Sequence, residues 1–412
     1  MIATEIENSL SQLTAELQAW RRHLHMHPEP SFQEWKTMDY VCEVLENYGI
    51  SYQKGVAETG VVAVIRASWH DQDASCLGLR ADLDALPIQE LNEVPYKSQN
   101  EGWMHACGHD GHTAMLMAAA QYIAQELDFS GTLNLIFQPA EEHPGGAKLM
   151  IEQGLFDKFP CDAVFAAHNM PGIAAGQLVF IEGPAMASSD DVTITLTGLG
   201  GHGAMPHLAP DPIVAAASIV MALQTIVSRN VNPLQTAVIT VGSLIAGKAN
   251  NVIPSSAQLA LSVRALDRDV RDLLQERITD LVTAQAKSLG VQAHIDYKRD
   301  YPVLVNTTLE TEMVRRVGLE LVGQDAVVHQ GSPLTGSEDF AFMLDHCPGS
   351  YFMIGNGRLD GSKGDPSVDQ SVGQCAPAHA CMVHNPGYDF NDDILPVGAA
   401  FWTLLTQRFL TN

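Results

Sequence analysis

Positive charge is scarce in this sequence. Only 23 of its 412 residues are lysine or arginine, against 48 aspartates and glutamates, which gives a formal net charge of −25. Nucleic acids and anionic membranes are therefore poor partners, because binding to phosphate needs a basic surface. A negative surface could gather metal cations, but a role in solubility is the simpler explanation of the charge.

Disulfide frameworks, a secretory signal and long apolar runs are also missing. The seven cysteines are scattered and odd in number, which excludes complete pairing, so we expect a reduced, cytoplasmic protein. Glu5 and Glu7 precede any apolar run, whereas a secretory signal starts basic and continues apolar. The longest apolar stretch, 213–227, is alanine-rich and contains Gln224, so it predicts a buried helix rather than a membrane span.

The composition and length that are present indicate a folded chain of two domains. Hydrophobic residues make up 46% and charged residues 17%, and 412 residues are too many for one ordinary core. Apolar, β-branched runs predict strands at 60–67, 76–83, 131–138 and 162–167. Periodic patterns predict helices at 4–27, 37–48, 112–127 and 147–153. This alternation predicts an α/β fold with a largely parallel sheet flanked by helices.

The middle of the chain has a different pattern. Strands are predicted at 192–197, 237–244, 257–265 and 292–297, and helices at 211–229 and 269–288. This β-α-β-β-α-β order predicts a small ferredoxin-like α+β domain with both helices on one side. We therefore expect residues 1–186 and 299–412 to form one domain and 187–298 to be inserted into it. Beyond the insertion we expect a loop at 356–380 and helices from near Ser337 and at 394–409.

Polar residues gather where three of the predicted strands end. Asp82 and Asp84 follow one strand, Glu141 and Glu142 a second, and His168 a third. Open α/β sheets bind ligands at the carboxyl ends of their strands. Three such ends that carry metal-ligand residue types therefore predict one site. A single end would be weak evidence, because acidic residues also cap the helix that follows a strand.

A further group of ligand-type residues opens the predicted helix at 112–127. It contains Cys107, His109 and His112 within six positions. Thiolate, imidazole and carboxylate suit zinc, manganese, cobalt or nickel without choosing among them. Alone, Cys107 would be explained as a small buried residue, but together with His109 we assign it to the site. His112 is explained as a residue of the helix start.

The adjacent carboxylates of Glu141 and Glu142 suit a division of labour. Neighbouring side chains in an extended segment point apart, so one can bind metal while the other accepts a proton from metal-bound water, whose pKa falls to ~7. Two other segments are less specific. Ser337, followed by two acids, fits a site or a helix start equally well. His384 precedes Asn-Pro-Gly on an irregular loop, where ligands are often placed.

Seven motifs resemble the amidohydrolase branch of a dinuclear metallopeptidase family: RADLDALP, HACGHDGHTAM, FQPAEE, GGHGAMPH, NVIP, GSEDF and HNPGYDFND. That branch includes hippurate hydrolases, bacterial aminoacylases and hydrolases of auxin–amino acid conjugates. The resemblance runs from about His25 to Gly398 and is more specific for the family than for the substrate. It implies metal-dependent hydrolysis of the amide bond of small N-acyl amino acids. It also implies two divalent metal ions (Mn, Zn, Co or Ni) and a homodimer formed through an inserted lid domain.

The resemblance also implies roles for individual residues. It implies Glu141 as the base, Asp84 as a residue that orients a ligand, and His202 as a residue that reaches the partner's active site. Asn251 and Arg264 would bind the carboxylate end of the substrate. The implied metal ligands are Cys107, His109, Glu142, His168 and His384.

Two features depart from the family. Ile245 stands where many relatives have histidine, which alters the expected shape or polarity of the substrate pocket. The stretch 357–380 is longer than usual, and Cys375 and Cys381 flank His379 there. A surface insertion is the simplest explanation, with a third metal site or a disulfide as alternatives.

Other functions fit the sequence less well. A metallo-carboxypeptidase or dipeptidase on the same scaffold is the main alternative, but no acidic partner for a substrate ammonium stands out. A binding protein that had lost the chemistry would show a broken base or ligand set, and both are intact here. A serine hydrolase would show a Gly-x-Ser-x-Gly motif, which is absent from the sequence.

Overall fold

The chain folds into two compact units in the computed structural model, which describes residues 2–67, 74–357, 379 and 381–411. The first unit contains residues 1–183, 305–332 and 342–412, and the second contains 184–304 and 333–341. The sequence-based boundaries assigned residues 333–341 to the domain formed by 1–186 and 299–412. In the structure these residues belong to the second unit.

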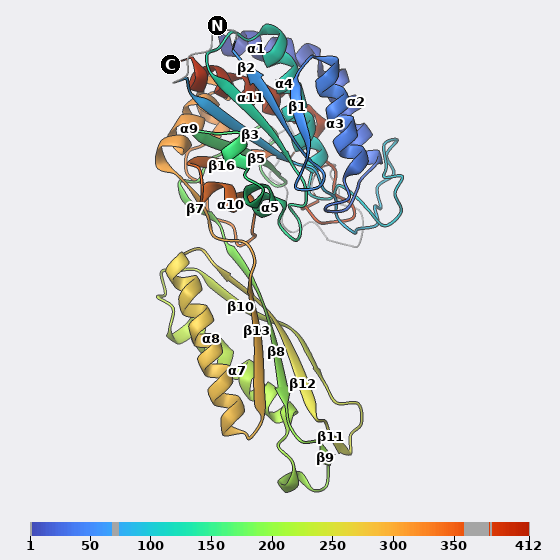
Figure 1. Ribbon diagram of the computed structural model, residues 1–412, viewed down its shortest axis with the longest axis vertical. Helices are drawn as coiled ribbons and strands as arrows, with labels where there is room; N and C mark the ends of the chain where they lie inside the picture. The colour runs from blue at the N-terminus through green and yellow to red at the C-terminus, as the bar shows by residue number, and fades with distance from the viewer. Residues whose placement is uncertain (1, 68–73, 358–378, 380, 412) are drawn as a thin grey trace. The chain divides into compact units, whose positions relative to one another are not determined.

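An eight-stranded mixed sheet forms the centre of the first unit (Figure 1). In sheet order its strands are β1 (Ser51–Val56), β2 (Gly60–Arg66), β4 (Thr132–Gln138), β3 (Cys76–Asp82), β5 (Ala163–Met170), β16 (Gly349–Gly355), β6 (Leu178–Val179) and β15 (Val327–Val328). The central strands β4, β3, β5 and β16 are parallel. The predicted α/β fold is confirmed, and the carboxyl ends of these four strands lie at one edge.

Helices flank this sheet. They are α1 (Ile2–Gln12), α2 (Thr14–Met26), α3 (Trp35–Asn47), α4 (His109–Glu126), α5 (Gly146–Glu152), α6 (Leu155–Lys158), α9 (Thr308–Val322), α10 (Phe340–Leu344, at the boundary of the units) and α11 (Leu395–Leu410). Helix α4 is buried along most of its length and packs against α11, α2 and β3. Its alanine- and methionine-rich sequence suits this central position, because small and flexible side chains fit between closely packed elements.

The prediction of one helix over 4–27 is wrong. The segment forms α1 and α2, which are interrupted at Leu13. Thr14 Oγ1 donates a hydrogen bond to Ser11 O at 2.7 Å. Local bonds of this kind compete with the helix ladder, and they are not visible in the apolar periodicity of the sequence.

The second unit has a four-stranded antiparallel sheet with helices α7 (Pro212–Arg229) and α8 (Arg268–Ser288) packed on it (Figure 1). The strand order is β10 (Ala237–Ala246), β12 (Ser256–Ala265), β8 (Ser188–Thr197) and β13 (Gln292–Arg299). The predicted β-α-β-β-α-β order is confirmed. The short ribbon of β9 (Gly201–His202) and β11 (Val252–Ile253) also lies in the second unit. A second ribbon pairs β7 (Gly183–Met186) with β14 (Leu304–Asn306), and its residues divide between the two units.

Helix α7 is buried on one face only. Ala215, Ile219 and Leu223 pack in the core of the second unit, whereas Val214 and Met221 are 53% and 72% exposed. The expectation of a buried helix over 213–227 is therefore only half right. Among the described residues α7 is long and apolar enough to cross a membrane, but this is weak evidence, because a core helix of a folded domain passes the same test.

The cysteines of the described residues differ in state. Cys42, Cys76, Cys107, Cys161 and Cys347 are free, but Cys381 is disulfide-bonded. The expectation of a wholly reduced protein therefore fails at Cys381. Within the part of the chain that the structure describes, His379 belongs to no group of potential metal ligands. Cys375 and most of the 357–380 stretch lie outside the described residues.

Candidate metal centre

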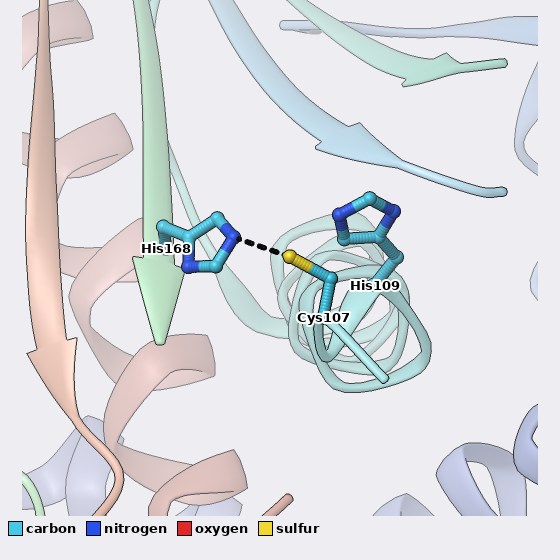
Figure 2. Close-up of side chains that lie close together, drawn as sticks. All are labelled: Cys107, His109 and His168. Atoms are coloured by element: carbon cyan, nitrogen blue, oxygen red, sulfur yellow. Dashed lines mark hydrogen bonds between the residues drawn. The ribbon is translucent and has the colours of Figure 1, made fainter. Parts of the chain in front are cut away.

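The five predicted metal ligands come together in the first unit. Ligand atoms of Cys107, His109 and His168 lie within 4.8 Å of one another, and so do those of Cys107, Glu142 and His384. Figure 2 shows His168, on β5, pointing towards Cys107, with 3.3 Å between Nε2 and Sγ. Cys107 belongs to both groups, and two overlapping groups of ligand atoms suit two neighbouring ions.

The chemistry of the imidazoles fits metal binding. His168 Nδ1 donates to Asn169 O at 2.6 Å, which leaves the lone pair of Nε2 towards Cys107. His109 is held through Nδ1 by Asp84, whereas its buried Nε2 has no hydrogen-bond partner among the residues that the structure describes. A histidine fixed through one nitrogen presents the other to a metal. Thiolate, imidazole and carboxylate together suit the transition metals inferred from the sequence.

Asp84 joins several parts of the site. It is 1% exposed, and its Oδ2 accepts hydrogen bonds from Ser31 Oγ at 2.8 Å and from Glu142 N–H at 3.0 Å. Its Oδ1 lies 3.2 Å from His109 Nδ1. Burial acts to raise the pKa of Asp84, but these hydrogen bonds outweigh it, and the pKa stays below its usual value. Asp84 therefore remains a carboxylate that orients His109.

The two adjacent glutamates have different neighbours. Glu142 Oε1 lies 3.2 Å from His384 Nε2 and 4.0 Å from His109 Nε2. Glu141 is 7% exposed, and its Oε2 lies 3.8 Å from His109 Nε2. Both glutamates group with His109, but Glu142 also groups with Cys107 and His384 and Glu141 does not. This arrangement favours Glu142 as the ligand, with Glu141 beside the ligands.

His384 comes from a loop rather than from the sheet. Its backbone has a φ of 65°, a left-handed conformation that is unusual for a residue other than glycine. Its N–H donates to Ala106 O at 2.7 Å, which joins the loop to the residues just before Cys107. Strained backbone of this kind is common at functional sites.

A polar network around Asn169 has no counterpart in the sequence-based assignment. Asn169 Nδ2 donates to Cys107 O at 2.6 Å, and its Oδ1 accepts from Tyr388 Oη at 2.6 Å. Its N–H donates to His112 Nε2, and His112 Nδ1 in turn bonds to Asp82 Oδ1 at 2.7 Å. His112 is thus more than a residue of the helix start. Asp82, His112 and Tyr388 lie in the motifs quoted from the sequence, but nothing in those motifs showed that the three residues join Asn169 in one network.

Two glycines allow the start of α4 to pack against this network. Gly108 has a φ of 98°, and a Cβ there would lie 2.3 Å from Asn169 Nδ2 and 2.5 Å from Tyr388 Oη. A Cβ at Gly111 would lie 2.2 Å from the ring of Phe390. Side chains are therefore excluded at both positions.

A buried ionic network adjoins the same helix start. Arg21, on α2, lies 2.8 Å from both Asp110 Oδ2 and Asp389 Oδ1. His25 Nδ1 lies 2.8 Å from Asp110 Oδ2, and its Nε2 lies 3.3 Å from Glu90 Oε1. Burial and Arg21 act to lower the pKa of His25, but Asp110 and Glu90 outweigh them and raise it to about 9. His25 is therefore charged at neutral pH.

The other predicted site residues lie in the second unit. His202 and Asn251 are exposed on neighbouring segments, with Gly203 N–H donating to Asn251 O at 2.8 Å. Arg264, on β12, donates from Nη1 to Ser337 Oγ at 2.9 Å. Ile245 is 66% exposed on β10.

The sequence left two explanations for the motif at 336–340, a functional site or a helix start. The structure contains a contact of the second kind. Glu338 Oε1 accepts a hydrogen bond from Phe340 N–H at 2.9 Å, and α10 begins at Phe340 rather than at Ser337. Ser337 instead accepts the hydrogen bond from Arg264.

The chain is similar to known hydrolases and to a metal-binding peptidase. The model of "Peptidase family M20/M25/M40" matches residues 78–385. The chain is 39% identical over 398 residues to the hippurate hydrolase of Campylobacter jejuni, with 97% of each chain covered. It is 40% identical over 348 residues to the N-acetyl-L-cysteine deacetylase of Bacillus subtilis, with 84% of this chain and 82% of that one covered. A solved dinuclear metal binding peptidase of family M20 from Bacillus subtilis matches with a TM-score of 0.80 and 30% identity, over 97% and 99% of the two chains.

Proposed function

The chain belongs to peptidase family M20/M25/M40 and is a metal-dependent amidohydrolase, and from this premise we propose that it hydrolyses N-acyl amino acids with Glu141 as general base. The observation that carries the proposal is the convergence of Cys107, His109, Glu142, His168 and His384. Glu141 lies beside this ligand set, and the names of the similar hydrolases supply the class of substrate.

The protein residues divide the work of hydrolysis. The two divalent ions, when bound, supply Lewis acidity for the scissile carbonyl and lower the pKa of water to ~7. Glu141 accepts a proton from the attacking water and returns it to the leaving nitrogen, so that water and amide become a carboxylic acid and an amine. The acid then passes its proton to the amine, and the products at neutral pH are a carboxylate and an ammonium. Asp84 meanwhile keeps His109 in its orientation.

Arg264 and Asn251 bind the free carboxylate of the substrate in this proposal. A guanidinium is permanently charged and can contact both oxygens of a carboxylate. Ser337 and Ser262 restrain the Arg264 side chain through hydrogen bonds of 2.9 and 3.3 Å. This feature would favour acyl amino acids over the corresponding amides.

A homodimer completes the active site in the same proposal, with His202 of one protomer serving the metal centre of the other. The second unit offers a surface for such a contact. Val214 and Met221 on α7 and Leu244 and Ile245 on the edge strand β10 are 46–72% exposed. Exposed apolar side chains beside an unpaired strand edge are typical of association surfaces. His202 would donate a hydrogen bond to the oxyanion that develops during hydrolysis.

Metal removal and a substrate panel test the proposal. Dialysis against a strong chelator should abolish the release of amino acid from acetylated and benzoylated amino acids. Manganese, cobalt, nickel or zinc should restore it. Full activity in demonstrably metal-free protein would overturn the mechanism. Faster cleavage of dipeptides with a free amino end would favour the carboxypeptidase or dipeptidase alternative.

A further inference from the structure

The segment between β4 and α5 carries both glutamates but belongs to no helix or strand. β4 ends at Gln138, and α5 begins at Gly146. Between them the buried Ala140 has a φ of 52°. A residue other than glycine keeps this left-handed conformation only where the surrounding contacts impose it. The contacts of Ala140 therefore decide where the next two side chains point.

Among the hydrogen bonds that hold this segment, three bear on the direction of the two glutamates. Ala140 O accepts from Gly146 N–H at 2.8 Å, and Glu142 N–H donates to Asp84 Oδ2 at 3.0 Å. The third runs from Ala140 N–H to Glu34 Oε1 at 2.9 Å. Glu34 is 106 residues away in the sequence, so this bond comes from the tertiary fold rather than from the local chain.

Glu34 is placed to act on the site from a distance. It is fully buried at the start of α3, and its second oxygen accepts a hydrogen bond from Thr59 Oγ1. Ser31, three residues earlier, donates to Asp84 Oδ2. The short segment 31–34 thus contacts both loops that carry the carboxylates of the site.

For the hydrogen bond to Ala140, the length of the Glu34 side chain is more important than its charge. Burial, and then the negative charge of Asp84, raise the pKa of Glu34 to about 7. Asp84 is the charged neighbour with the largest effect on this pKa. Close to neutral pH the side chain is therefore partly protonated. A carboxyl oxygen can accept the Ala140 N–H in either state.

We propose that Glu34 is a positioning residue for amide hydrolysis: its oxygen holds Ala140 and thereby directs Glu141 towards the reaction and Glu142 towards the metal ligands. Glu34 acts only through the backbone of this segment. The roles of the two glutamates rest on the proposed function, whereas the contacts of Glu34 do not.

Substitutions of Glu34 that separate length from charge test the proposal. Glu34→Gln keeps the length and an acceptor oxygen, so kcat per metal-loaded site should stay within about threefold of the unmodified protein. Glu34→Asp keeps the charge but is one methylene shorter. Its kcat should fall on the order of ten- to a hundredfold, because a small misplacement of a catalytic group has an effect of this size. KM should change little in either variant.

Thr59→Val is the matched control. It removes the other hydrogen bond of Glu34 and leaves the bond to Ala140, so its kcat should remain within about threefold of normal. A Glu34→Asp protein with normal kcat would overturn the proposal. So would a loss that appears in KM alone, or one that only follows a lower melting temperature.

A second background keeps the test decisive if Glu34→Asp folds poorly. Glycine adopts a positive φ without a steric penalty, so Glu34→Asp should reduce kcat less when combined with Ala140→Gly. An equal reduction in both backgrounds would contradict a role through the conformation of Ala140.

The visible absorption of cobalt-loaded protein gives a readout that does not depend on activity. A displaced Glu142 should change the ligand-field bands in Glu34→Asp, whereas Glu34→Gln should show the normal spectrum. Unchanged bands together with a normal kcat would reject the positioning role. If the unmodified protein cleaves no acyl amino acid but the bands change as expected, the proposed function fails and the positioning of Glu142 stands.

Discussion

At the scale of single residues, the neighbours of Glu141 and Glu142 lead to opposite expectations for the same substitution. Glu141→Gln keeps the shape and loses the base, so turnover should stop while metal content stays normal. Glu142→Gln should lower the metal content, because Glu142 groups with Cys107 and His384. Metal analysis and kinetics on both proteins check this. The reverse pattern of metal loss would mean that the two roles are exchanged.

His25 makes stability depend on pH. Its pKa in the folded protein is about 9, above the ordinary value of 6.5. A raised histidine pKa contributes stability that is complete below about pH 6.5 and is lost as the pH rises through about 9. The free energy of unfolding should therefore fall over this range, by roughly 3 kcal/mol from this group.

Denaturant titrations between about pH 6 and about pH 10, a range that spans both pKa values, measure this change in the free energy of unfolding. In His25→Gln the protein should be less stable at pH 6, and the difference from the unmodified protein should shrink as the pH rises. A difference that stays constant with pH would show that His25 does not change its charge in this range.

At the scale of secondary-structure elements, one side chain joins the end of β5 to the start of α4. Asn169 bonds to Cys107 O and accepts from Tyr388 Oη. Loss of such supporting contacts weakens metal binding on the order of ten- to a hundredfold. We expect this loss for Asn169→Ala and a smaller one for Tyr388→Phe, which keeps the bond to Cys107. Competition with a chromogenic chelator measures both, and a larger loss in Tyr388→Phe would contradict the expected order.

Most of the predicted elements have a consistently apolar face, although β16 was missed even though all seven of its residues are buried. β2 to β5 and α4 were predicted because their buried residues are nearly continuous. β1 was missed because five of its six residues are not buried. α9 was missed because its buried residues are few and separated by charges. The break at Leu13 depends on local hydrogen bonds that periodicity does not show.

The residues of the site also divide into those that the sequence predicted and those that it did not. Cys107, His109 and His168 stand next to element ends, where polar residue types are conspicuous in an apolar chain. His112 and Asn169 contribute through partners that are about 30 to 60 positions away. Glu34 lies still further from Ala140. Contacts of this kind arise from tertiary packing, so a single sequence does not reveal them.

At the scale of the whole molecule, the predicted homodimer separates the base from the oxyanion donor. Glu141 lies in the first unit and His202 in the second. If His202 acts on the partner's site, a mixed dimer of Glu141→Gln and His202→Ala protomers contains one complete site. Activity should then return when the two inactive proteins are dissociated together and reassociated. Loss of His202 alone should reduce the rate about a hundredfold or more.

The control for this experiment is each inactive protein reassociated alone. Differently tagged protomers establish that mixed dimers have formed. Background activity in proven mixed dimers would reject a role for His202 in its partner, and a monomer in solution would reject the dimer itself.

Because Gly108 and Gly111 are tightly packed, substitutions at these two positions should be as harmful as substitutions of the metal ligands. In a library of random variants selected for growth on an acyl amino acid, both positions should tolerate no substitution, alanine included. They would be depleted as strongly as Cys107 or His109, although neither carries a functional group. Tolerance maps of such a library would therefore outline the packing that supports the metals as well as the atoms that touch them. During evolution, amino-acid substitutions should consequently accumulate most slowly at the start of α4.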